Sequence, residues 1–549
     1  MNWKKWISIA AAVCLAVTAV PMRAVAQEEL LQEKMLEEIK EEIKEELKEE
    51  PKEEKEEKEE KEEKEEKEEL QEQSDEKIEP QEKSKKELLK GISLLMEEEN
   101  STEVFEDKTA DFEGEGTAAN PYEIQNVDDL KKLAANVNGG ETSNSGITYE
   151  SKYFKLTADI DLKNEEWIPI GTIVYVGESG NSELRPFQGT FDGGGHQIAN
   201  LTISNGGDHV GLFGLVDGGT IKSCNITGNV NGYTYVGGSV GFAGKATTIE
   251  NCSFQGDVNG KSMYVGGIVG SANANTKIRN CSFQGDVEGT NDFVGGIVGD
   301  MAYGCEVSGC FVIGKVEGSE RVGGIAGDAC QSIKNCYYSG DVLAKNYAGG
   351  IAGKASDVTI ENCYYSGNVS ASKWAGGIAG YIAGISLEET SYSVIRNCVS
   401  LAEEVSGGSN ANRIAGYINI TTLTNNYAWS GTKIKGNPVS AASDGEDLTY
   451  ENGTLSEQFS DIFDNTDSAW KFTNNGLPIL NDVGGTQSAY LPLYLTKASF
   501  YGNGTAEIPY EIRNVNDLKK LAEKVNNGTN YAGKYFKQTA NIDLSNEPN

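Results

Sequence analysis

The chain has very little histidine, with only two in 549 residues. These are His196 and His209. A zinc peptidase of the HExxH type needs two histidines one helical turn apart with a glutamate beside the metal, and neither histidine has that setting. We therefore expect no catalytic residue, no metal site and no cofactor in this chain, and we lean against an enzyme.

Long apolar runs are also scarce, because only residues 7–20 form one. Lys4 and Lys5 precede this run and small residues follow it at positions 24–26, which is the pattern of a secretory signal peptide over residues 1–26. No later run approaches the roughly 18 residues that a membrane-spanning helix needs. We predict a secreted or cell-surface protein without a membrane span after signal cleavage.

Positive charge is in short supply, since 48 Lys and Arg face 84 Asp and Glu for a net charge of −36. Much of the acidity lies in residues 27–110, where Lys-Glu-Glu triplets place Glu54 four residues before Lys58, a spacing that supports a solvated helix. We predict a charged spacer here, helical or disordered. Apolar residues recur at helical spacing over residues 36–47, so a short coiled coil is an alternative to the spacer. The negative charge argues against a nucleic-acid partner.

Glycine and a repeated block are what the chain has in abundance. The block recurs from about Tyr233 to Gly407, with runs such as VGGIVG and AGGIAG. A cysteine marks the same point in each copy and forms a predicted structural ladder: Cys224, Cys252, Cys281, Cys310, Cys336, Cys363 and Cys398. A fixed period of this kind indicates one supersecondary unit stacked on itself.

The repeat predicts an all-β fold, a parallel β-helix over residues 166–436. Cys252, Phe254, Gly256 and Val258 alternate with period two, so they share one face of an extended strand. A period near 27 residues fits one coil of a three-faced solenoid in which like residues stack about 4.8 Å apart. The paired glycines of the VGGIVG runs would leave room at a crowded corner.

Two other segments flank the repeats. Residues 111–165 predict a small α/β capping unit, with strands at 122–124 and 153–156 and a helical stripe of Leu130, Leu133, Ala134 and Val137. Residues 499–549 repeat this unit and predict the start of a second, truncated module, so we expect a fragment. Residues 437–498 are interpreted as the closing end of the solenoid and a linker.

These runs resemble a known motif. VGGIVG and AGGIAG resemble the GLUG motif, and residues 189–203 with residues 152–162 resemble the leading segment found with it. The resemblance implies a right-handed β-helix on secreted or surface-attached bacterial proteins. These include adhesin-like proteins and the non-catalytic regions of IgA-cleaving zinc metallopeptidases.

We interpret the cysteines and the carboxylates as structural residues. We expect the ladder cysteines to be buried apolar residues, with Cys305 and Cys330 as the one disulfide candidate. Asp159 with Asp161, or a ladder of aspartates in the repeats, could be proposed as catalytic. Other copies carry Asn or Lys at the matching positions, which argues for turn residues and leaves weak calcium binding open.

Three aromatic residues are candidates for facing a ligand. We expect Tyr337, Tyr364 and Trp374 on the outer surface, where they could stack on sugar rings or a protein partner. The sequence favours an extended binding face for adhesion to a host or polymer surface, with the cell wall as another partner. Two alternatives stay open: the non-catalytic region of an extracellular peptidase or polysaccharide-acting enzyme, and a passive cell-wall spacer.

Overall fold

The structure is a computed structural model. It describes residues 112–139, 146–176, 181–384, 393–438, 442–449, 455–466, 468–473, 476–487, 489, 491–496, 500, 504–506, 509–512, 515–539 and 542. The predicted signal peptide and charged spacer lie outside the described residues. Within the described part of the chain, no helix has the length and apolar character needed to cross a membrane.

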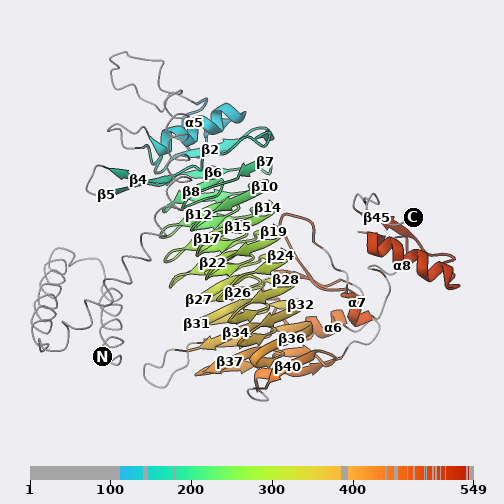
Figure 1. The fold of residues 1–549 in the computed structure, drawn as a ribbon. Coiled ribbons are helices and arrows are strands. Elements are labelled where there is room, and N and C mark those ends of the chain that lie inside the picture. The colour runs from blue at the N-terminus through green and yellow to red at the C-terminus, as the bar shows by residue number, and fades with distance from the viewer. Residues whose placement is uncertain are drawn as a thin grey trace, which may run out of the picture. The chain divides into compact units, whose positions relative to one another are not determined.

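A small unit of two strands and a helix begins the described chain (Figure 1). Strands β1 (Tyr122–Ile124) and β2 (Tyr153–Leu156) pair in parallel, and helix α5 (Val127–Asn138) connects them. The side chain of Asn126 accepts hydrogen bonds from the first turn of α5, which satisfies amide groups that have no partner within the helix. The apolar stripe of α5 is buried, so the predicted helix and both predicted strands of the capping unit are confirmed.

A regular coil of the solenoid contains five short strands. In one coil these are β14 (Ser253–Gln255), β15 (Val258–Gly260), β16 (Val265–Gly266), β17 (Val269–Ala272) and β18 (Lys277–Arg279). Each pairs in parallel with the equivalent strand of the next coil. The chain is therefore a parallel β-solenoid, as the repeat predicts, and its coils are stacked in Figure 1.

The other coils repeat these strands, which merge in places. Strands equivalent to β14 or β15 are β7 (Gln197–Ile203), β10 (Asn225–Gly232), β19 (Ser282–Gln284), β20 (Val287–Gly289), β24 (Phe311–Ile313), β25 (Val316–Glu317), β28 (Tyr337–Ser339), β29 (Val342–Ala344), β32 (Tyr364–Ala371), β36 (Val399–Asn412), β39 (Tyr427–Trp429) and β40 (Lys433–Asn437). Strands equivalent to β16 are β11 (Val236–Gly237), β21 (Val294–Gly295), β26 (Arg321–Gly323), β30 (Tyr347–Gly349) and β33 (Trp374–Gly376). Strands equivalent to β17 or β18 are β6 (Thr190–Asp192), β8 (Phe213–Val216), β9 (Thr220–Lys222), β12 (Val240–Ala243), β13 (Thr248–Glu250), β22 (Val298–Met301), β23 (Glu306–Ser308), β27 (Ala326–Lys334), β31 (Ala352–Glu361), β34 (Ala379–Ala383), β35 (Ser393–Arg396), β37 (Ala415–Asn419) and β38 (Thr421–Thr424). The first coil also holds β3 (Ile160–Asp161) and an antiparallel hairpin of β4 (Thr172–Val176) and β5 (Asn181–Arg185).

The interior of the solenoid is a stack of identical apolar positions. All seven ladder cysteines are fully buried, and Phe254 lies over Phe283 with ring centroids 6.0 Å apart. The Cys252 thiol donates to the backbone carbonyl of Glu250, and its neighbours in the ladder make the equivalent bond. Burial raises the pKa of the Cys281 and Cys310 thiols well above the ordinary value, so these groups remain protonated.

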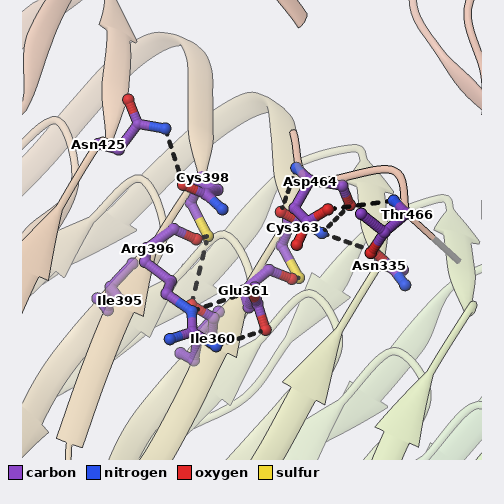
Figure 2. Close-up of polar contacts among 12 residues, drawn as sticks. Asn335, Ile360, Glu361, Cys363, Ile395, Arg396, Cys398, Asn425, Asp464 and Thr466 are labelled. Atoms are coloured by element: carbon purple, nitrogen blue, oxygen red, sulfur yellow. Dashed lines mark hydrogen bonds and ion pairs between the residues drawn. The ribbon is translucent and has the colours of Figure 1, made fainter. Parts of the chain in front are cut away.

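An asparagine precedes most ladder cysteines and forms the corner between two sheets. Asn335 and Asn362 have left-handed backbone with φ of 53° and 52°, a conformation that asparagine tolerates better than most residues. The Asn362 Nδ2 donates to the Asn335 Oδ1 at 3.1 Å, so the corner is also a hydrogen-bonded ladder. Figure 2 shows this corner, where Arg396 pairs with Glu361 through two contacts of 2.9 and 3.0 Å.

The segment after the last coils packs along the outside of the solenoid. Its first strand, β41 (Glu446–Leu448), still pairs in parallel with β39 at the end of the stack. The part outside the solenoid contains α6 (Leu455–Ile462), β42 (Trp470–Lys471), β43 (Ile479–Leu480) and α7 (Leu493–Thr496). We call residues 455–487 the strap. Its buried residues, including Phe459, Trp470 and Leu480, form an apolar cluster with outward-facing residues of the solenoid. The segment predicted as a closing end and linker thus covers part of one face.

The last described residues repeat the N-terminal unit. Strands β44 (Tyr510–Ile512) and β45 (Phe536–Gln538) pair in parallel, and helix α8 (Val515–Asn526) lies between them in sequence. Leu518 and Val525 are 36% and 50% exposed, whereas the equivalent Leu130 and Val137 are fully buried.

Candidate binding surface

Two columns of outward-facing side chains run side by side along one edge of the solenoid. The ring column contains His209, Tyr235, Tyr264, Phe293, Arg321, Tyr347 and Trp374, one residue from each of seven successive coils. The companion column contains Phe242, Ser271, Asp300, Asp328, Lys354, Tyr381 and Tyr417. We call the two columns together the stripe.

Glycine allows the two columns to lie next to each other. The chain leaves the ring column, turns through a glycine pair and returns as the next strand. A Cβ on Gly270 would lie 2.7 Å from the backbone nitrogen of Val236, which is closer than real Cβ atoms come. Because only a glycine permits this approach, the repeated glycines of the VGGIVG runs bring the two outer columns together.

The first four rings of the ring column stack face to face. Centroid distances are 4.7 Å for His209–Tyr235, 4.8 Å for Tyr235–Tyr264 and 4.7 Å for Tyr264–Phe293. The Arg321 guanidinium then lies 4.3 Å from the Phe293 centroid, a cation–π contact that continues the column. These contacts match the spacing of the coils, so the column stabilises the stack while it presents ring edges outward.

The same rings occupy strained backbone. The φ angles of His209, Tyr235, Tyr264 and Phe293 are 61°, 55°, 67° and 62°. Left-handed backbone is uncommon for any residue other than glycine and is a true outlier for bulky residues. Strain of this kind persists where the surroundings over-determine the conformation, and it concentrates at functional sites.

The middle of the stripe is charged. Asp328 contacts both Arg321 and Lys354, with N–O distances of 3.5 and 3.4 Å. Asp300 lies one coil away in the same column and accepts a hydrogen bond of 3.4 Å from the Ser271 hydroxyl. Burial raises the pKa of Asp300 to about 6, with a further contribution from the charge of Asp328. The stripe therefore has a charged centre of both signs between two aromatic ends.

Four rings from both columns lie together at the C-terminal end of the stripe. Trp374 contacts Tyr347, Tyr381 and Tyr417 at centroid distances of 5.0, 5.2 and 4.8 Å. Tyr381 and Tyr417 are nearly parallel at 5.0 Å. All four side chains are half-buried, so Trp374 lies partly on the surface, and its contact with a ligand stays a prediction.

The prediction that Tyr337 and Tyr364 face a ligand is wrong. Both rings point outward from the solenoid and stack at 4.9 Å, but they are 1% and 0% exposed because the strap covers them. The Tyr364 hydroxyl donates to the Pro478 carbonyl at 2.9 Å, and its ring contacts Trp470. These tyrosines belong to the interface that holds the strap.

The predicted disulfide is not formed in the structure. Cys305 and Cys330 are free, and the Cys305 thiol donates to the Ala272 and Asn273 carbonyls of the preceding coil, away from Cys330. The pairing receives no support from this geometry and stays a prediction.

The aspartates of the repeats have a structural role. The Asp257 carboxylate accepts a hydrogen bond of 3.0 Å from the Asp286 amide of the next coil, and Asp341 accepts one from Asn368. The Asn229 side chain accepts the equivalent hydrogen bond from the Asp257 amide, which explains why both Asn and Asp occur at this position. Asp257, Asp286 and Asp341 are therefore coil-to-coil acceptors.

Near the capping unit, Asp159 accepts from the Gln197 amide and contacts the His196 Nδ1 at 3.1 Å. These hydrogen bonds lower the pKa of Asp159, which is fully exposed. Asp161 accepts from Asn200 in the same way. Within the residues that the structure describes, no group of three His, Cys, Asp or Glu residues could hold a metal ion.

The stripe was missed in the sequence, although it left a signal. An aromatic residue stands two positions before the glycine pair at Tyr264, Phe293, Tyr347 and Trp374, and Tyr381 and Tyr417 come directly after the glycine run. What the sequence did not reveal is that the glycines fold these two positions against each other.

Three kinds of comparison bear on this chain. A model of the GLUG motif matches residues 261–288. Halomucin of Haloquadratum walsbyi (strain DSM 16790 / HBSQ001) is 32% identical over 162 residues. That alignment covers 28% of this chain and 2% of Halomucin, so the chain spans only a small fraction of that relative.

Two solved structures are similar in part. A candidate immunoglobulin A1 protease from Bacteroides ovatus has a TM-score of 0.37 and 21% identity, over 68% of this chain and 95% of that chain. An IgA1 protease has a TM-score of 0.34 and 16% identity, over 71% and 26% respectively.

Proposed function

We propose that this GLUG-repeat β-solenoid works outside the cell as an adhesion module, which binds a host or polymer surface through the stripe. The predicted signal peptide supports export. The observation that carries the proposal is the stripe itself, in which strained aromatic residues recur on consecutive coils beside a half-buried charged centre. Strained backbone concentrates at functional sites, so its recurrence on these coils supports a binding role over a passive spacer.

The mechanism would be repeated shallow contact. Each coil adds one residue to each column, so a long partner meets several weak contacts in series, and their combined affinity exceeds that of any one. The stripe presents apolar and polar groups to such a partner. The apolar groups are ring edges, and the polar groups are tyrosine hydroxyls and the charges of Arg321, Asp328 and Lys354. A surface of this kind suits recognition without turnover.

The experiment is a surface-binding assay with the full chain. Purified protein is applied to immobilised mucin, collagen, peptidoglycan, cellulose and chitin, and compared with the double variant Trp374→Ala/Tyr417→Ala. Tyr303→Ala is the matched control, because Tyr303 is 66% exposed and lies outside the stripe. We expect binding to at least one surface, a loss of about tenfold or more in the double variant, and no change in the control.

Two outcomes contradict the proposal. Absence of binding to every surface favours the spacer, and equal binding by the double variant moves the binding site away from the stripe. Thermal unfolding of each variant verifies that the solenoid has folded.

A further inference from the structure

A small hollow lies beside His209, at the N-terminal end of the ring column. Its volume is about 220 Å³, and it lies between the chain after β3 and the turn that follows β7. Glu166, Ile168 and Pro169 line one side, and Asn205, Asp208 and His209 line the other. Pockets that enclose drug-sized ligands measure roughly 300–1,000 Å³, so this hollow suits a smaller group, about the size of one sugar ring.

His209 gives the hollow an aromatic wall. In a stack of rings, each interior ring has both faces occupied, and only a terminal ring can offer a face to a ligand. Tyr235 stacks on one face of His209 at 4.7 Å, and Phe242 meets the same ring edge-on at 5.9 Å. Among the described residues no ring stacks on the opposite side of His209. A flat ligand in the hollow would extend the column by one member.

The His209 ring is suited to an uncharged partner. Burial lowers the pKa of His209 below its ordinary value, so the ring is neutral near pH 7. A neutral imidazole has one N–H donor and one nitrogen acceptor, which is what a hydroxyl group needs for pairing.

The rim of the hollow is fixed and acidic. The Ser204 amide donates to the Glu166 Oε1 at 2.8 Å, which ties the two sides of the hollow together. The Asn138 side chain holds the adjacent loop through the Pro169 carbonyl and the Gly171 amide, at 2.9 and 2.8 Å. Glu166 and Asp208 both carry negative charge at the rim, which disfavours phosphate, uronate or sialate ligands and leaves carboxylate acceptors for hydroxyl groups.

We infer that this hollow binds one uncharged sugar ring, the terminal residue of a glycan chain, stacked on His209. The inference rests on the proposed function, because the rest of the glycan would follow the stripe away from the hollow. The ring face packs against the apolar face of the sugar, and the Asp208 and Glu166 carboxylates accept hydrogen bonds from its hydroxyls. A protein partner is less suited, since the hollow admits a single ring.

The histidine content permits a direct test. The chain has two histidines, so selective ¹³C labelling of histidine gives two imidazole signals, and His196 in its exposed turn serves as an internal control. The full chain is titrated with glucose, galactose, mannose and N-acetylglucosamine, and with sialic acid as a charged probe. We expect at least one neutral sugar to shift the His209 signals saturably and to leave those of His196 unchanged.

Two variants separate a ring face from a structural role. We expect His209→Ala to weaken sugar binding about tenfold, measured by saturation transfer to the sugar, and His209→Phe to retain it because the ring face remains. Equal sugar binding by His209→Ala, no shift of His209 with any neutral sugar, or a preference for sialic acid each overturns the inference.

The outcomes also separate the two proposals. If the stripe variant loses surface binding while neutral sugars leave His209 unaffected, the adhesion proposal stands and the sugar site fails. If the full chain binds no surface, the adhesion proposal fails, whatever His209 does.

Discussion

Tyr264 shows how one residue can be both strained and stabilising. Its ring is stacked between Tyr235 and Phe293, at 4.8 and 4.7 Å. Its φ of 67° is costly for any residue with a Cβ, by about 1–2 kcal/mol. The two ring contacts offset this cost, since each contributes about 0.5–1.5 kcal/mol beyond area burial. At Tyr264 the cost of the strained backbone and the stabilisation from the two ring contacts are therefore of similar size.

We predict that Tyr264→Ala lowers the free energy of unfolding by about 1–3 kcal/mol, because two ring contacts are lost and the strain remains. Tyr264→Gly should be about 1 kcal/mol more stable than Tyr264→Ala, since glycine accepts this backbone. Urea unfolding of the two variants measures the difference.

Tyr347 is the matched control. It occupies the same column in strand β30 without a positive φ, so glycine there should be less stable than alanine. The same order of stability at both positions would show that backbone strain at Tyr264 is not what sets the difference.

At the scale of the element, the strap determines which outward-facing aromatic residues are exposed to solvent. It covers Phe311, Tyr337 and Tyr364, which otherwise would form an exposed apolar ladder. Polar contacts fix its path: the Asn362 side chain exchanges two hydrogen bonds with the Asp464 backbone, at 2.6 and 3.1 Å, beside the corner in Figure 2. The Gln284 Nε2 donates to the Thr486 carbonyl at 2.6 Å, three coils from Asn362. An exposed ladder would risk association between copies, so the strap also protects the sheet.

We predict that Trp470→Ala loosens the strap by about 3–5 kcal/mol, because the ring is 2% exposed and its removal leaves a cavity over Tyr364. Hydrogen exchange in residues 455–487 should rise sharply, while exchange in the coils before residue 250 stays unchanged.

Trp470→Phe is the control for this prediction. Among the described residues no acceptor meets the buried Trp470 Nε1, so the phenyl ring retains most of the packing and removes an unsatisfied donor. Equal loosening by both variants would mean that the strap depends on more than this ring's packing.

At the scale of the whole molecule, the repeated interior buries the thiols of the ladder cysteines and makes them unreactive. The ladder cysteines are sealed between coils, and a thiol reacts only as an accessible thiolate. Cys330 is the one described cysteine that is only half-buried, and this partial burial raises its pKa to about 11. Thiol reactivity of the described cysteines in the folded protein should therefore be low and confined to Cys330.

We predict that, among the described cysteines, a disulfide reagent labels only Cys330 in the native protein and does so slowly, and that Cys330→Ser abolishes this labelling. Denaturation should expose all of the described cysteines. If the denatured protein instead yields two thiols fewer, Cys305 and Cys330 are bonded after all; rapid native labelling of the ladder would contradict the sealed interior.

The sequence by itself determined the parallel β-solenoid, the buried cysteine ladder and the capping unit. Period-two alternation and a fixed repeat act locally: Cys252, Phe254 and Val258 must share a face whatever the rest of the chain does. The helix over residues 127–138 followed from its apolar stripe for the same reason.

Only the tertiary structure decided which outward residues are exposed. Tyr337 and Trp374 both point out of the solenoid, yet one is sealed under the strap and the other lies on the stripe. The difference comes from Trp470 and Gln487, which are more than 90 residues distant in sequence from either, and from glycines that press separate strands together. Periodicity fixes which side of a strand a residue faces, and long-range packing determines whether that side meets water.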